Sequence, residues 1–132
     1  MKNKHKFYLN IAESVSKASY CKRLQVGAIL VKDDNIISFG YNGTPKKFDN
    51  DCECDGITKP EVLHAESNCI TKCALTTNSS KGSTMYATHS PCIECAKLII
   101  QCEIKELYFN IEYRDLSGIN LLKQHGIYVK QL

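Results

Sequence analysis

Two short segments of potential metal ligands constrain the fold of this chain more than any other feature of its sequence. The first segment contains His64 and Glu66, and the second contains Pro91, Cys92 and Cys95. One imidazole and two thiolates suit zinc, and a catalytic zinc ion keeps three protein ligands so that water takes the fourth position. The fold must therefore bring His64 next to Cys92 and Cys95.

Both segments have the composition of helix starts, so two positive helix ends with free backbone N–H groups would face one point and favour bound thiolates. A single residue separates Glu66 from His64, which places the carboxylate near the metal without binding it. A carboxylate in that position can take a proton from water and later donate it. We therefore predict His64, Cys92 and Cys95 as zinc ligands and Glu66 as the catalytic base and acid.

A closed structural zinc site is the alternative interpretation of the cysteine pair. Such a site normally needs a second pair spaced Cys-x-x-Cys. The other pairs in the chain, Cys52 with Cys54 and Cys69 with Cys73, have irregular spacing. A structural site also has no use for Glu66, although a non-catalytic zinc-binding module remains the non-enzyme alternative.

The hydrophobic pattern predicts strands that alternate with helices. Apolar residues at helical spacing indicate a first helix over residues 4–19, and two apolar runs around a polar turn indicate a hairpin of residues 26–31 and 36–39. Residues 40–60 have loop composition, and loops of this length are usually functional. Helices are further expected over 64–75, 91–101 and 117–123, and strands over 84–88, 107–109 and 127–129. The fold class is therefore α/β, with helices on both faces of a sheet with parallel or mixed pairing.

Length and composition limit the classes of protein to consider. A chain of 132 residues fits a single domain over residues 1–132, and without a signal peptide or an apolar run of roughly 20 residues we expect it in the cytoplasm and not in a membrane. There its eight cysteines are more readily metal ligands or buried thiols than disulfides. The net charge of +3 is too small to indicate a nucleic-acid partner but suits a small anionic substrate.

His64 and Glu66 together with Pro91, Cys92 and Cys95 form the signature of zinc-dependent deaminases. The chain also resembles deoxycytidylate deaminases, including small phage and bacterial members of the cytidine/deoxycytidylate deaminase family. The resemblance is carried by Cys-Lys-Arg-Leu-Gln-Val-Gly-Ala at 21–28, Gly-Tyr-Asn-Gly at 40–43 and Thr-His-Ser-Pro-Cys at 88–92.

This resemblance implies both a fold and a reaction. The fold would have three layers, with a five-stranded mixed sheet between helices. The enzyme would hydrolyse dCMP to dUMP and ammonia through a water activated at the zinc, and the dUMP would feed dTMP synthesis. Family members are commonly homohexamers that dCTP activates and dTTP inhibits.

The resemblance also implies which residues bind the nucleotide. Arg23 and Arg114, the only arginines of the chain, would bind the 5′-phosphate, for which a planar guanidinium is well suited. Tyr113 would close over the nucleotide. The alternative for each arginine is an ordinary solvated surface charge.

Three further positions would bind the sugar and base. Asn42 would bond to both, and the backbones of Ala65 and Ser90 would meet the polar edge of the ring. The alternative for Asn42 is a turn residue, because Asn and Gly are typical of turns.

A second, structural zinc site is a further prediction. Cys21, Cys52 and Cys54, completed by His89, would tie the long loop to the end of the first helix, as additional zinc ions do in some relatives. The alternative is that these cysteines are free thiols.

Other deaminases are the remaining alternatives. An enzyme that acts on another cytosine or adenine nucleoside, nucleotide or nucleic acid, such as the tRNA adenosine type, shares the zinc site. A nucleic-acid substrate usually requires a broad basic surface, which a charge of +3 does not indicate.

Overall fold

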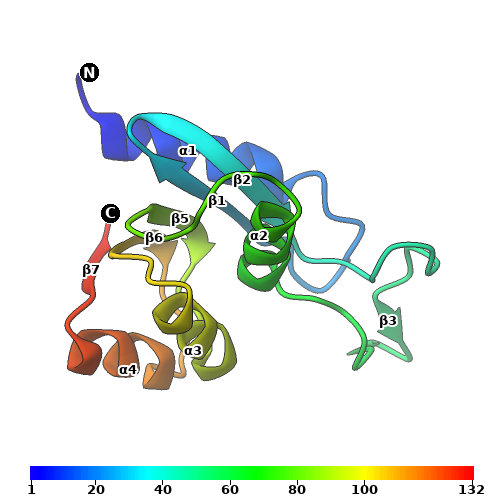
Figure 1. Cartoon of the computed structure of the whole chain (residues 1–132). Coiled ribbons are helices and arrows are strands. Elements are labelled where there is room, and N and C mark those ends of the chain that lie inside the picture. The colour runs from blue at the N-terminus through cyan, green and yellow to red at the C-terminus, as the bar shows by residue number, and fades with distance from the viewer.

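The computed structural model describes residues 1–132, and its main feature is a five-stranded mixed sheet in the order β2-β1-β5-β6-β7 (Figure 1). The strands are β1 (Gly27–Lys32), β2 (Asn35–Tyr41), β5 (Thr84–His89), β6 (Glu106–Ile111) and β7 (Tyr128–Gln131). β1 pairs antiparallel with β2 and β5, whereas β5, β6 and β7 run parallel. The predicted mixed α/β sheet is therefore confirmed.

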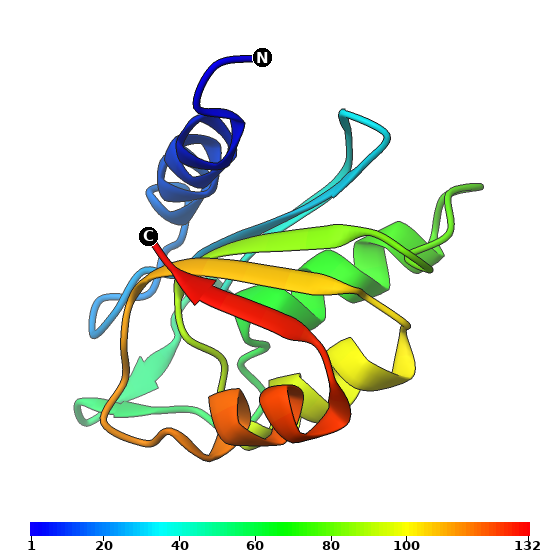
Figure 2. The same ribbon diagram turned by 90° about the vertical axis from the view of Figure 1, so that its left-hand side faces the viewer.

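Four helices complete the two outer layers. They are α1 (Lys4–Ser16), α2 (Ala65–Ala74), α3 (Ile93–Gln101) and α4 (Ser117–His125). Figure 2 views the sheet nearly edge-on, with α1 on one face and α2, α3 and α4 on the other. The three-layer arrangement expected from the family resemblance is confirmed. None of the helices is long and apolar enough to cross a membrane.

The two faces of the sheet carry separate apolar cores because side chains alternate along each strand. In β1, Ala28 and Leu30 point into the larger core under α2, α3 and α4. Ile29 and Val31 point into the smaller core under α1. All four side chains are buried, so residues 28–31 are apolar without alternation.

One edge of the sheet collects the ends of several strands. β5 and β6 are parallel, so the segments that follow His89 and Ile111 leave the sheet side by side. β1 is antiparallel to β5, and its first residue, Gly27, donates its N–H to Thr88 Oγ1 at 3.1 Å. Polar residues just outside these strand ends are therefore brought together, as is usual for ligand sites in α/β proteins.

Part of the predicted loop 40–60 folds into a hairpin. Its strands are β3 (Glu53–Cys54) and β4 (Ile57–Thr58), joined by a turn at Asp55 and Gly56. Both turn residues have positive φ, 52° and 76°, which matches the Asp-Gly turn of a tight hairpin. β2 also extends further than predicted, to Tyr41.

The predicted ends of three helices are wrong by a few residues. α1 ends at Ser16 instead of residue 19. Pro91 precedes the N-cap Cys92 instead of occupying the first helical position of α3. α4 begins at Ser117 as predicted but ends at His125 instead of residue 123.

We predict that Gly27→Ala destabilises the protein by roughly 1–3 kcal/mol, the usual cost of overpacking. A Cβ at this position would collide with the carbonyl oxygen of Ala12 and lie 2.6 Å from the backbone nitrogen of Ser16, so α1 would have to move off the sheet. Urea denaturation measures the change in the free energy of unfolding.

Gly43→Ala is the matched control, because nothing lies within 4 Å of a Cβ at Gly43. Equal destabilisation by the two substitutions would contradict the close packing of α1 on β1.

Candidate active site

Two helix N-termini provide the side chains of the predicted metal site. His64 is the N-cap of α2, and Cys92 is the N-cap of α3. Both have extended backbone angles, with ψ of 157° and 171° respectively, so each is the last non-helical residue before its helix. Cys95 lies in the first turn of α3. The prediction that both segments are helix starts is confirmed.

The backbone before α2 is fixed by an isolated bridge between Gly43 and Leu63. The N–H of Gly43 donates to the Leu63 carbonyl at 3.1 Å, and the Leu63 N–H donates back to Gly43 at 2.8 Å. This exchange holds the residue before His64 against the end of β2, and so fixes where α2 begins.

The three predicted ligands converge within one cluster. His64 Nδ1 lies 3.4 Å from the sulfur of Cys92 and 3.4 Å from the sulfur of Cys95. Tetrahedral zinc with ordinary Zn–N and Zn–S bond lengths would separate nitrogen from sulfur by about 3.5 Å. The donor set and its spacing therefore fit a zinc ion.

The cluster is electrostatically coupled. Hydrogen bonding with Cys95 and with His64 lowers the pKa of Cys92 to about 3, so this residue is a thiolate at neutral pH. The hydrogen bond with Cys92 raises the pKa of His64, and hydrogen bonding with Cys92 together with burial raises the pKa of Cys95. Cys92 is thus already in the ionised form that a metal requires.

Glu66 is buried beside this cluster, with 4% of its surface exposed. Burial disfavours the charged carboxylate and raises the pKa of Glu66 to about 7. A carboxyl group with a pKa near neutrality can both accept and donate a proton, which is what general acid–base catalysis requires.

A cavity of about 560 Å³ opens in front of His64, Glu66 and Cys92. Five of the six predicted substrate-binding residues line it: Arg23, Asn42, Ala65, Tyr113 and Arg114. The two arginines thus share one cavity within a single chain, although they lie far apart in the sequence. Ser90 is not part of the cavity wall.

The side chain of Asn42, at the cavity wall, binds the backbone just before β1. Its side-chain Oδ1 accepts a hydrogen bond from the Val26 N–H at 2.9 Å, and its Nδ2 donates to the Leu24 carbonyl at 2.7 Å. An amide NH₂ has two hydrogens, so one donor of Asn42 is left for a ligand. Its contact with sugar and base stays a prediction.

Ser90 and His89 lie behind Tyr113. The Ser90 hydroxyl accepts a hydrogen bond from the Tyr113 N–H at 2.8 Å, and the Ser90 N–H donates to the Ile111 carbonyl at 2.8 Å. The rings of His89 and Tyr113 are stacked with centroids 5.4 Å apart. Both residues therefore hold Tyr113 at the rim of the cavity.

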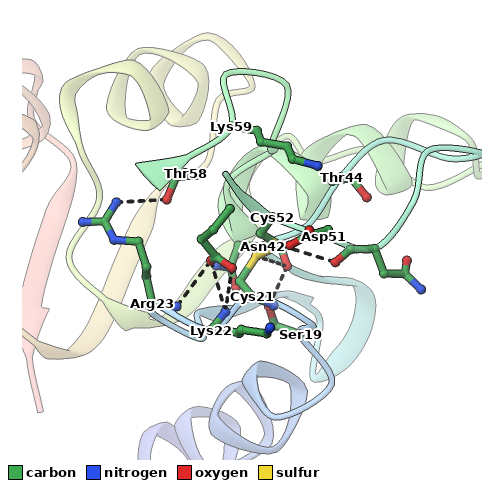
Figure 3. The surroundings of a disulfide bond; sticks show 12 residues. Ser19, Cys21, Lys22, Arg23, Asn42, Thr44, Asp51, Cys52, Thr58 and Lys59 are labelled. Atoms are coloured by element: carbon green, nitrogen blue, oxygen red, sulfur yellow. Dashed lines mark hydrogen bonds between the residues drawn. A yellow bond between two sulfur atoms is a disulfide. The ribbon is translucent and has the colours of Figure 1, made fainter. Parts of the chain in front are cut away.

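The predicted second metal site is not assembled as expected. Cys21 and Cys52 instead form a disulfide, the state that the sequence favoured less than metal ligands or buried thiols (Figure 3). Cys54 is exposed, and His89 Nδ1 forms a hydrogen bond with Thr88 Oγ1 at 2.7 Å. Neither residue lies close enough to Cys21 and Cys52 to share a metal ion with them. Cys54 pairs with Ile57 in the β3–β4 hairpin.

Two of the remaining cysteines are packed as predicted. Cys69 and Cys73 are buried free thiols in the larger core. Cys102, at the end of α3, is a partly buried free thiol that packs against the same core.

Sequence reasoning missed Gly118 as part of the site. A Cβ at Gly118 would meet the carbonyl oxygen of Pro91 and lie 2.8 Å from the carbonyl carbon and oxygen of Cys92. The backbone of α4 therefore packs directly on the segment that presents the metal ligand. A glycine inside a helical pattern is the signal that could have identified this contact.

Comparison with known proteins gives consistent matches. Residues 1–111 match the family model described as the cytidine and deoxycytidylate deaminase zinc-binding region. The crystal structure of dCMP deaminase from the cyanophage S-TIM5, in complex with dCMP and dUMP, superposes with a TM-score of 0.96 at 45% identity. That match covers 100% of this chain and 99% of the phage chain.

Two curated relatives extend these matches. A probable deoxycytidylate deaminase of Caenorhabditis elegans is 40% identical over 119 residues, which cover 85% of this chain and 59% of the nematode protein. ComE operon protein 2 of Bacillus subtilis is 32% identical over 133 residues, which cover 97% of this chain and 70% of the relative. The chain thus spans only part of the length of these two relatives.

We predict that Cys92→Ala binds one zinc ion less per chain than the unsubstituted protein, because three protein ligands are needed at a site of this kind. Atomic absorption on protein purified without chelator measures the zinc. Cys102→Ala is the matched control at the other end of α3, since its thiol lies outside the ligand cluster. Unchanged zinc in Cys92→Ala would contradict the assignment.

Proposed function

Because this chain belongs to the cytidine and deoxycytidylate deaminase family, we propose that it hydrolyses dCMP to dUMP and ammonia. The observation that carries the proposal is a single cavity lined by two members of the zinc-ligand cluster, a buried carboxyl group and two arginines. The volume of about 560 Å³ lies within the usual range for small-molecule sites.

His64, Cys92 and Cys95 would hold the zinc, which when bound supplies Lewis-acid activation of a water molecule. Glu66 would accept one proton from the water as its oxygen adds to carbon 4 of the ring. The same carboxyl would then donate this proton to the amino group as the C4–N bond breaks, and the second proton of the water would move from the oxygen at carbon 4 to N3, so that ammonia leaves and dUMP remains. The pKa of Glu66 near 7, raised by burial, suits both directions of transfer at neutral pH.

The N-terminus of α2 supports binding of the base. Ala65 is the first residue of the helix and lines the cavity. The first N–H groups of a helix have no partner within it. The Ala65 N–H is therefore available to donate to the carbonyl oxygen of the pyrimidine, while the free donor of Asn42 would bond to the sugar and base.

Arg23 and Arg114 support binding of a nucleotide over a nucleoside. Both arginines line the cavity that His64 and Cys92 also line. Neither forms a salt bridge with an acidic residue of the chain. Their charge is thus left to pair with a 5′-phosphate, and Tyr113, which lines the same cavity, would close over the nucleotide.

Further properties are proposed on the family resemblance alone. Residues 1–132 would be one deaminase domain in the cytoplasm, assembled as a homohexamer, activated by dCTP and inhibited by dTTP. The dUMP would serve thymidylate synthesis, and neither nucleic acid nor membrane would be a partner.

Glu66→Gln is expected to keep zinc and fold but to lower kcat by roughly 10²–10⁴-fold, because an amide of the same shape cannot accept a proton. The loss of cytosine absorbance at saturating dCMP measures kcat, and zinc analysis confirms that the site is filled. Substantial activity in the zinc-loaded variant would refute the role of Glu66.

Arg23→Ala and Arg114→Ala should each cost roughly 1.5–3 kcal/mol in kcat/KM for dCMP, the range for a hydrogen bond to a charged group. Deoxycytidine, which has no phosphate, should be a far poorer substrate of the unsubstituted enzyme and should lose little more in either variant. The assay compares dCMP, CMP, deoxycytidine and dCTP. Equal losses for dCMP and deoxycytidine would show that the arginines serve the structure instead.

A further inference from the structure

The β3–β4 hairpin presents two polar side chains toward the segment that precedes β1. Glu53 and Thr58 are direct partners in the antiparallel register of this hairpin. Directly opposed residues of an antiparallel pair share one face, so both side chains point the same way. Both also line the cavity that Arg23 lines.

Glu53 binds the backbone of the Arg23 segment. Its Oε2 accepts hydrogen bonds from the N–H of Lys22 at 3.1 Å and from the N–H of Arg23 at 3.3 Å. Its Oε1 also lies 3.3 Å from the Lys22 nitrogen. One carboxylate thus fixes two consecutive peptide groups of a segment about 30 residues away in sequence.

Thr58 binds the other end of the same residue. The Arg23 guanidinium donates from Nη1 to Thr58 Oγ1 at 3.1 Å, and Figure 3 shows the side chain extended toward Thr58 from its backbone beside Lys22. The Cys21–Cys52 disulfide joins the two segments next to these contacts. The hairpin therefore holds Arg23 at both its backbone and its guanidinium.

Arg23 has a charged partner at its backbone and a neutral partner at its guanidinium, and this difference affects how it can bind an anion. The carboxylate of Glu53 is bonded to peptide N–H groups, and only a neutral hydroxyl is bonded to the guanidinium. A guanidinium has five N–H donors, so four remain for an anion. A carboxylate on the guanidinium would instead compete with a phosphate for the same donors.

Arg23 also needs such support because it is exposed. Ordering a long, mobile side chain on binding costs free energy, and a side chain already held in place avoids part of that cost. Held by Glu53 and Thr58, Arg23 loses less freedom when an anion binds.

We infer that Glu53 and Thr58 are positioning residues for Arg23 and that they determine the preference of the enzyme for a 5′-phosphorylated substrate over the free nucleoside. This inference rests on the proposed function, in which Arg23 binds the phosphate. Neither residue is assigned contact with the substrate, since each acts through Arg23.

The charge of Glu53 makes the test discriminating. A negative charge near the phosphate site disfavours the anion, so removing charge alone should leave binding of dCMP equal or tighter. Removing the oxygen of Glu53 that accepts the two backbone hydrogen bonds should weaken the binding of dCMP. Glu53→Gln keeps an acceptor oxygen for the two N–H groups that Oε2 binds, whereas Glu53→Ala keeps none.

The experiment determines kcat and KM of the zinc-loaded enzyme for dCMP and deoxycytidine. Glu53→Ala should raise KM for dCMP about 3- to 10-fold, the cost of ordering one mobile side chain, with kcat nearly unchanged. The same variant should leave deoxycytidine turnover unchanged, and Glu53→Gln should restore KM for dCMP. Thr58→Val should raise KM for dCMP in the same direction and keeps the test decisive if Glu53→Ala fails to fold.

Asp55→Asn is the matched control, because Asp55 is an exposed acidic residue of the same hairpin with no side-chain hydrogen bond. It should leave both substrates unaffected. The double variant Arg23→Ala/Glu53→Ala should be no worse with dCMP than Arg23→Ala alone, because residues that act through one another are not additive.

The outcomes separate this inference from the proposed function. Equal losses for dCMP and deoxycytidine in Glu53→Ala, additive losses in the double variant, or no rescue by Glu53→Gln would overturn the positioning role. If Arg23→Ala weakens dCMP selectively while Glu53→Ala and Thr58→Val do not, the positioning role fails and the proposed function stands. If Arg23→Ala has no selective effect on dCMP, the phosphate role of Arg23 fails together with the inference.

Discussion

The convergence of two helix N-termini on one point is the constraint on which the rest of the structure depends. α2 and α3 start at His64 and Cys92, and their ligand atoms lie within 4.8 Å of one another and of Cys95. The sheet makes this possible, because the ends of β2 and β5 lead toward the two helix starts at the same edge. Positive helix ends favour the thiolate of Cys92, so fold and chemistry agree at this point.

Around that point, polar side chains bind the backbone of neighbouring segments. Asn42 ties the entry of β1, Ser90 ties the segment after β6, and Glu53 ties the residues before Arg23. These contacts satisfy peptide groups that the strands leave unpaired at their ends. The loops around the cavity are therefore joined to one another by hydrogen bonds between side chains and backbone.

Much of the fold and of the metal site could be predicted from the sequence, since helix periodicity and ligand spacing are local signals. The order of the elements and the ligand set around His64 and Cys92 follow from such signals. The disulfide between Cys21 and Cys52 could not, because it joins residues 31 positions apart in a chain with eight cysteines. The β3–β4 hairpin was missed although Asp55 and Gly56 form a recognised turn pair, because its strands are too short to show alternation.

Because the Cys21–Cys52 disulfide can be reduced, the stability of the protein depends on the redox conditions around it. The effect acts on the unfolded state of the chain. Closing a loop of 31 residues removes conformations from the unfolded state, an entropic effect of about 3–4 kcal/mol in the simple loop-closure description. A chain whose Cys21 and Cys52 are reduced regains that freedom without losing a single native hydrogen bond. The segment from β2 to α2, which carries much of the cavity wall, is then held only by non-covalent contacts such as the hydrogen bonds of Asn42, Glu53 and Thr58.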